Sequence, residues 1–150
     1  MLLARAALIF QFNRDIQMLR DTLVGITQRQ LADPGFHPES TLQESLALLA
    51  ANYFHEGEVL AHKSGRQFDP PLETDDTWRA DVLRGRDEWT LATLQNDLED
   101  AWEFYAQMLR DVADSDYVAY VQYHNGNVPR FAHDLSRRIA SWRMRSEGQS

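Results

Sequence analysis

The sequence predicts an all-α fold, a four-helix bundle with short extra helical turns, in a single domain of residues 1–150. The first observation behind this prediction is that apolar residues recur at steps of three and four along four long segments, as they do on one face of a helix. The second is that capping residues, glycines and prolines separate these segments, with no repeat or low-complexity tract between them. Four amphipathic helices bury their apolar faces most simply against one another.

Composition and charge limit the function classes that fit. The chain carries 15 Lys and Arg against 23 Asp and Glu, a formal net charge of −8. This argues against a duplex nucleic-acid binder, which must neutralise phosphates with clustered cations. The absence of Cys from the sequence excludes disulfides, thiolate metal ligands and a Cys nucleophile. The apolar run 6–10 is too short for a signal peptide or a membrane span, so we expect a cytoplasmic protein without a membrane partner.

The first helix is expected over residues 2–24, and Gly25 ends it. Thr27 and Gln30 have the spacing of a capping box, which predicts a short helical turn ending near Leu31. Residues 33–38, with two prolines and a glycine, predict a loop. The apolar stripe of the first helix consists of Leu8, Phe12, Ile16, Leu19 and Leu23.

The second helix is expected to begin at residue 40 or 41, because Thr41 and Glu44 form another capping box. It should run to about Lys63, with Ser64 and Gly65 as its stop. Residues 66–73 include two consecutive prolines and form the longest expected connection. The main buried stripe of this helix consists of Leu42, Leu46, Leu49, Tyr53 and Leu60.

The third helical region is expected to start near Asp75 and Asp76 and to break at Gly85. Thr90 should cap its long continuation, which the acidic segment 114–116 ends. Residues 117–126 have Val and Tyr at strand-like spacing, but no second strand is evident, so we expect a loop or a short helical turn. The stripe of the long continuation consists of Leu91, Leu94, Leu98, Trp102, Tyr105, Leu109 and Val112.

The final helix is expected over residues 128–145. Asn127 should cap it, and Pro129 should lie in its first turn, where a missing N–H costs little. Arg143 and Arg145 complement the dipole at its C-terminus. Its apolar stripe consists of Val128, Phe131, Ala132, Leu135, Ile139 and Trp142.

In the order of these features the chain resembles the DinB-like (DinB/YfiT-like) superfamily of four-helix bundles. The resemblance rests on the segment LVGITQRQLADPG, on the capped second helix STLQESLALLAANY, and on the long third and final helices. Many members bind a divalent metal such as Zn or Ni through three His, one on the second helix and two, four residues apart, on the last. Related proteins include thiol-dependent isomerases and transferases.

The family's three His are not all present in this chain: one alignment register keeps one of them and the other keeps none. The second-helix position falls at Leu48. On the final helix, matching letters gives His133 and Arg137, whereas matching helical phase gives Phe131 and Leu135. His133 lies roughly 140° from the centre of the apolar stripe at 100° per residue, and a guanidinium has no lone pair to donate. We therefore predict no family-type metal site and no cofactor.

Other candidate motifs are incomplete. His55 and His62 resemble a damaged zinc motif, but they are seven residues apart and that motif needs four. A metal held by His55 with Glu99 or Glu103 is conceivable, and a solvent-exposed His is the simpler interpretation. The acidic cluster of residues 97–103 lacks the Glu-x-x-His of di-iron bundles, so it is interpreted as a solvated face. Ser136 follows His133 by three residues but has no orienting acid in the sequence.

Two functional hypotheses from different classes follow. The first is a metal-free DinB-like protein that binds a small molecule or serves as a stress-related accessory module. The alternative is a thiol-dependent transferase or hydrolase with a rearranged metal site that uses His55 and His133. A two-fold homodimer is compatible with both. The residues expected to line the ligand cleft are Leu48, Tyr53, His55, Trp102, Phe131 and Leu135.

Overall fold

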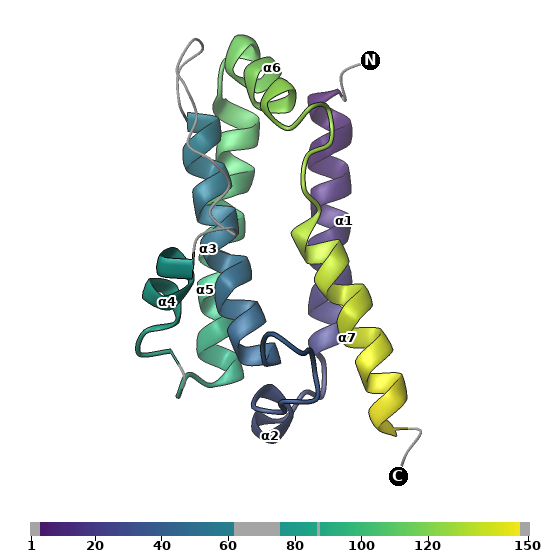
Figure 1. Cartoon of the computed structure of the whole chain (residues 1–150). Helices are drawn as coiled ribbons and strands as arrows, with labels where there is room; N and C mark the ends of the chain where they lie inside the picture. The colour runs from purple at the N-terminus through teal and green to yellow at the C-terminus, as the bar shows by residue number, and fades with distance from the viewer. Residues whose placement is uncertain (1–3, 62–75, 87, 148–150) are drawn as a thin grey trace.

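The computed structural model describes residues 4–61, 76–86 and 88–147, and within these ranges it is all-helical. Four long helices form a bundle, and three short helices lie at its ends or on its side (Figure 1). None of the helices in the described ranges combines the length and hydropathy that a membrane span requires. The elements are α1 (Arg5–Leu23), α2 (Gln28–Leu31), α3 (Leu42–Ala61), α4 (Asp76–Leu83), α5 (Leu91–Asp111), α6 (Asp114–Tyr123) and α7 (Phe131–Glu147).

The bundle consists of two pairs of parallel helices. α1 and α7 run in the same direction, as Figure 1 shows. Two contacts agree with this: Asp15 pairs with Arg130, and farther along both helices the Thr22 carbonyl accepts from Arg143. α3 and α5 run together in the opposite direction: the Gln43 amide near the start of α3 donates to the Trp89 carbonyl just before α5. A parallel pair needs a long crossover, and residues 62–90, which include α4, make it from α3 to α5.

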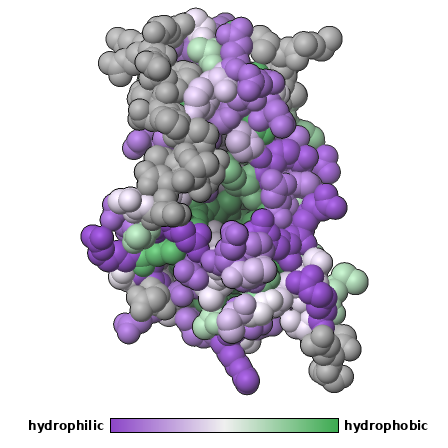
Figure 2. Space-filling view, viewed as in Figure 1, coloured by the Kyte–Doolittle hydropathy of each residue, from purple (hydrophilic) through white to green (hydrophobic). Residues whose placement is uncertain are grey.

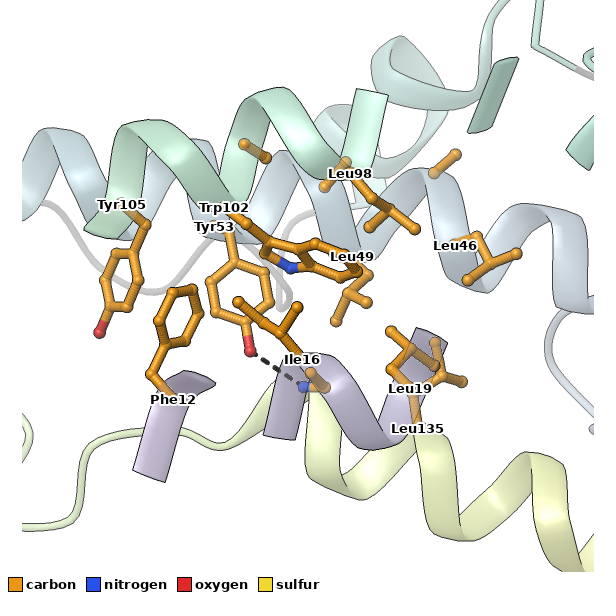
Figure 3. Packing of buried hydrophobic residues seen from close by; sticks show 14 of the residues in the cluster. Phe12, Ile16, Leu19, Leu46, Leu49, Tyr53, Leu98, Trp102, Tyr105 and Leu135 are labelled. Carbon is orange, nitrogen blue, oxygen red and sulfur yellow. Dashed lines mark hydrogen bonds between the residues drawn. The ribbon is translucent and has the colours of Figure 1, made fainter. Parts of the chain in front are cut away.

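The core lies between the two pairs and contains the apolar stripes that the sequence predicts. Every stripe residue expected on the first and second helices is buried. In Figure 3 Phe12 and Ile16 of α1 point toward Tyr53 of α3 and Trp102 of α5. The rings of Phe12 and Tyr53 meet edge to face with centroids 5.4 Å apart. Helical periodicity therefore identified the buried faces correctly.

Local capping signals also set the helix starts where the sequence predicts them. Thr27 and Gln30 form the complete capping box of α2. Thr41 accepts from the Glu44 amide, and the Glu44 carboxylate accepts from the Thr41 amide, so α3 begins at Leu42. The Thr90 hydroxyl accepts from the Thr93 amide at the start of α5. The predicted stop at residues 64–65, the loop 66–73 and the start at Asp75 lie outside the described residues.

The expectation of a loop or a short helical turn over residues 117–126 is wrong for residues 117–123, because a ten-residue helix, α6, occupies residues 114–123; residues 124–126 do form a turn. Asp114 and Asp116 begin this helix rather than end the preceding one, and their carboxylates suit the positive end of its dipole. The apolar residues that suggested strand spacing bury one helical face instead: Tyr117, Tyr120 and Val121 follow the i, i+3, i+4 pattern.

The predicted start of the final helix is also wrong. α7 begins at Phe131, so Asn127 does not cap it and Pro129 lies before its first turn. Tertiary contacts fix the start instead. The guanidinium of Arg130 donates to both carboxylate oxygens of buried Asp15, at 2.8 and 3.0 Å. The hydroxyl of Tyr53 accepts from the Ala132 amide at 3.0 Å and satisfies one of the helix's free N–H groups.

Candidate functional site

A groove of about 320 Å³ lies between α3 and α7. Leu48 and Leu49 of α3 form one apolar wall, and Phe131 and Leu135 of α7 form the other. Figure 2 shows hydrophobic surface at the bottom of a hollow between these two helices. The polar groove residues are His37, Glu39, Ser40, Ser45, Asn52, Arg79, Asp134 and Arg138. We call this site the α3–α7 groove.

Three of the groove residues occupy the positions where the family resemblance places metal ligands. Leu48, Phe131 and Leu135 come from antiparallel helices and line one concave surface. These three residues therefore lie together in space. Arg137, which matching letters would put at a ligand position, is exposed and is not among the groove residues.

The end of the groove at the α2–α3 connection is polar. The Arg79 guanidinium donates to the Glu39 carbonyl at 2.9 Å and lies 3.9 Å from the Glu44 carboxylate. The Nδ1 atom of His37 accepts from the Glu39 amide at 3.2 Å, which leaves Nε2 as the donor of a neutral ring. The hydroxyls of Ser40 and Ser45 are 2.9 Å apart and hydrogen-bonded.

Tyr53 was expected to line the cleft but lies beneath it. Its side chain is buried, and its ring meets the Phe131 ring edge to face at 5.6 Å. Figure 3 shows its hydroxyl pointing at the first turn of α7, where it accepts from Ala132. Burial raises the pKa of this hydroxyl well above its ordinary value. Tyr53 therefore supports the groove wall and fixes the position of Phe131.

Two other expected cleft residues lie in separate hollows. Trp102 lines a hollow between α1 and α5, where the Arg20 guanidinium is 5.5 Å from the centroid of its ring. His55 lines another, between α3, α4 and α5, with Trp78 and Asp97. The six expected residues therefore do not share one cleft.

The carboxylates that were considered as partners for His55 lie elsewhere. Glu99 forms a bidentate pair with Arg20, at 2.6 and 2.7 Å, and Glu103 lines the Trp102 hollow. Asp97 is the acidic residue of α5 in the His55 hollow, and partial burial raises the pKa of its carboxyl. The Nε2 atom of His55 is buried and makes no hydrogen bond with the described residues.

His133 lies between α1 and α7, away from the groove, as helical phase predicts. It borders a hollow with Phe10 and Arg14, and its Nδ1 atom is 3.3 Å from the Asp134 carboxylate. His55 and His133 therefore do not meet, and among the described residues no three His, Asp or Glu side chains are grouped as metal ligands would be. His62 lies outside the described residues.

A buried polar network joins α3, α5 and α6, and the sequence analysis missed it. The Glu56 carboxylate accepts from the Tyr120 hydroxyl and is bonded to His124 Nε2, both at 2.9 Å. The Tyr105 and Tyr120 hydroxyls are 2.8 Å apart. Burial raises the pKa values of both tyrosines. The sequence spacing could have predicted that Glu56 is buried, because Glu56 lies three residues after Tyr53 and so continues the buried stripe of α3.

This network is structural. Its side chains are almost completely buried and belong to none of the hollows described above. A paired buried carboxylate holds the packing of α6 against α3 in one arrangement, since any other arrangement would leave a charge without a partner.

The chain matches no known protein-family model, no curated protein and no solved structure.

Proposed function

We propose that this protein binds a small organic molecule in the α3–α7 groove. The observation that carries the proposal is the concave surface that Leu48, Phe131 and Leu135 form at the junction of two helices. Its volume of about 320 Å³ is at the lower end of the usual range for small-molecule sites. A few polar side chains beside an apolar wall are typical of such sites, because they orient a ligand that apolar contacts hold.

We further propose that the chain is a divergent DinB-like bundle without the His triad, acting as a binding or stress-related accessory protein. Two features support this. The bundle consists of two parallel pairs of helices with a long crossover from α3 to α5, and the three residues aligned with the ligand positions line one groove. Leucine and phenylalanine have no lone pairs for a metal, so these positions suit apolar groups of a ligand.

Ligand-observed NMR with a fragment library, followed by methyl shift mapping, tests the proposal. Hits should perturb the methyl signals of Leu48 and Leu135. Leu48→Trp should abolish binding, because an indole fills the groove. Val118→Trp is the matched control, since it adds the same ring at an exposed position on α6. The proposal would be contradicted if the hits bound the Leu48→Trp variant with unchanged affinity. A stoichiometric divalent ion bound at micromolar affinity would also contradict it.

Homodimerisation and a cytoplasmic location stay predictions. Light scattering coupled to size-exclusion chromatography measures the first directly: a mass near 17.4 kDa would identify a monomer, and twice that mass a dimer.

A further inference from the structure

One end of the α3–α7 groove is polar, and the other end holds Phe131 and one neutral polar side chain, Asn52. Ser45 lies about one turn before Leu48 on α3, and Arg138 lies about one turn after Leu135 on α7. Because the two helices are antiparallel, both polar residues are displaced toward the same end of the groove. His37, Ser40 and Arg79 line the groove as well, from the connection before α3 and from α4. A ligand that matched this surface would have an apolar body and one polar head.

Arg79, Arg138 and the Glu39 carboxylate lie at the polar end, and the Arg138 guanidinium, unpaired among the described residues, favours a negatively charged head. Arg138 makes no ion pair with any residue in the described ranges, even though Asp134 is four residues away on the same helix. Asp134 pairs instead with His133, and its side chain is 68% exposed. Arg79 uses one nitrogen for both the Glu39 carbonyl and the Glu44 carboxylate, so its other N–H donors can still reach a ligand.

The charges around the groove favour a singly charged head over a doubly charged one. A guanidinium presents a planar pair of N–H donors that matches the two oxygens of a carboxylate. The neutral His37 ring offers Nε2–H, because its Nδ1 already accepts from Glu39. Glu39 and Asp134 also border the groove, and their negative charges would repel a dianion more than a monoanion.

Resting on the proposed function, we infer that the groove ligand is an amphipathic carboxylic acid. Its carboxylate binds at Arg138 and Arg79, and its hydrocarbon part lies on Leu48, Phe131 and Leu135. In this assignment Arg138 determines which head group binds, whereas the apolar contacts hold the hydrocarbon part of the ligand.

Octanoate, 1-octanol and octyl phosphate are suitable probes, since they share a chain and differ in the head group. We expect octanoate to bind more tightly than 1-octanol. Arg138→Gln should weaken octanoate about tenfold, the loss of roughly one charge-assisted hydrogen-bonding group, and leave 1-octanol unchanged. Arg137→Gln is the matched control, because it removes the same charge from the neighbouring exposed position. It should change neither affinity.

The outcomes separate this inference from the proposed function. The carboxylate assignment is wrong if octanoate and 1-octanol bind with equal affinity and Arg138→Gln changes neither affinity. If Leu48→Trp still abolishes binding of both, the groove is nevertheless a ligand site. Tighter binding of octyl phosphate than of octanoate would also overturn the assignment. If no octyl probe shifts the Leu48 or Leu135 methyl signals, the carboxylic acid assignment is wrong, and the proposed function also fails only if the fragment library gives no hit in the groove. Unchanged circular dichroism and thermal melting of the variants confirm that the comparison concerns folded protein.

Discussion

The Glu56 network allows a stability prediction in which the direction of each hydrogen bond matters. Tyr120 has one hydroxyl proton and donates it to the Glu56 carboxylate. The 2.8 Å contact with Tyr105 therefore uses Tyr120 as the acceptor and Tyr105 as the donor. Consequently the two tyrosines are not equivalent, even though both are buried in the same cluster.

Tyr120→Phe has two costs. It removes a hydrogen bond to a charged group, worth about 1.5–3 kcal/mol, and it leaves the buried Tyr105 hydroxyl without an acceptor, at about 1–3 kcal/mol. Allowing for partial relaxation, we expect a loss of about 3 kcal/mol, a large part of a typical total of about 5–15 kcal/mol. Tyr105→Phe removes one neutral bond and should cost about 1 kcal/mol.

The double variant distinguishes this reasoning from a simple count of contacts. With Phe at both positions no donor is left unpaired, so adding Tyr105→Phe to Tyr120→Phe should restore about 1 kcal/mol rather than remove it. Urea denaturation followed by circular dichroism measures all three free energies of unfolding. The reasoning is refuted if Tyr105→Phe costs as much as Tyr120→Phe, or if the two costs add.

Three further predictions follow from burial and packing. Burial raises the pKa of Asp97, so its contribution to stability is present below its unfolded pKa and is lost as pH rises through the folded value. Asp97→Asn should therefore raise the melting temperature more at pH 7 than at pH 3. An equal gain at both pH values would exclude burial of the charged Asp97 carboxylate as the cause. Gly57→Ala should destabilise α3 by about 1–3 kcal/mol, because a Cβ there would lie 2.5 Å from Phe104 Cε2; denaturation in a Phe104→Leu background should recover most of the loss. The phenols of Tyr53, Tyr105 and Tyr120 have pKa values raised by burial, so ultraviolet titration should show them ionising only when the chain unfolds at alkaline pH; three normal titrations before unfolding would count against their burial.

The parts of the fold that local sequence controls are the parts that could be predicted. The helix starts at Leu42 and Leu91 depend on side chains within one turn. The capping residues Thr41 and Thr90 therefore predict both starts from the sequence. The start of α7 depends on Asp15 and Tyr53, which are far away in sequence, so no local pattern reveals it. Those tertiary hydrogen bonds overrode the local signals for an earlier start.

The candidate site could be predicted only in part for a related reason. Periodicity shows which face of each helix is buried, but not which neighbour that face meets. Leu48 and Leu135 do share a groove, because α3 and α7 are neighbours. Trp102 is on the buried face of α5 yet lies beside α1, and His55 faces α4. Which helices are adjacent depends on the crossover, and no motif in residues 62–90 specifies that.

The pairing of α1 with α7 has a consequence for how the chain folds during synthesis. The Asp15–Arg130 pair joins residues 115 positions apart, and translation at about 5–20 residues per second takes roughly 6–23 s to cover that distance. Throughout that time the apolar face of α1 lacks its parallel neighbour, and an exposed face of this kind favours aggregation or chaperone binding. A nascent chain arrested before residue 131 should therefore be held by chaperones much more strongly than one that includes α7.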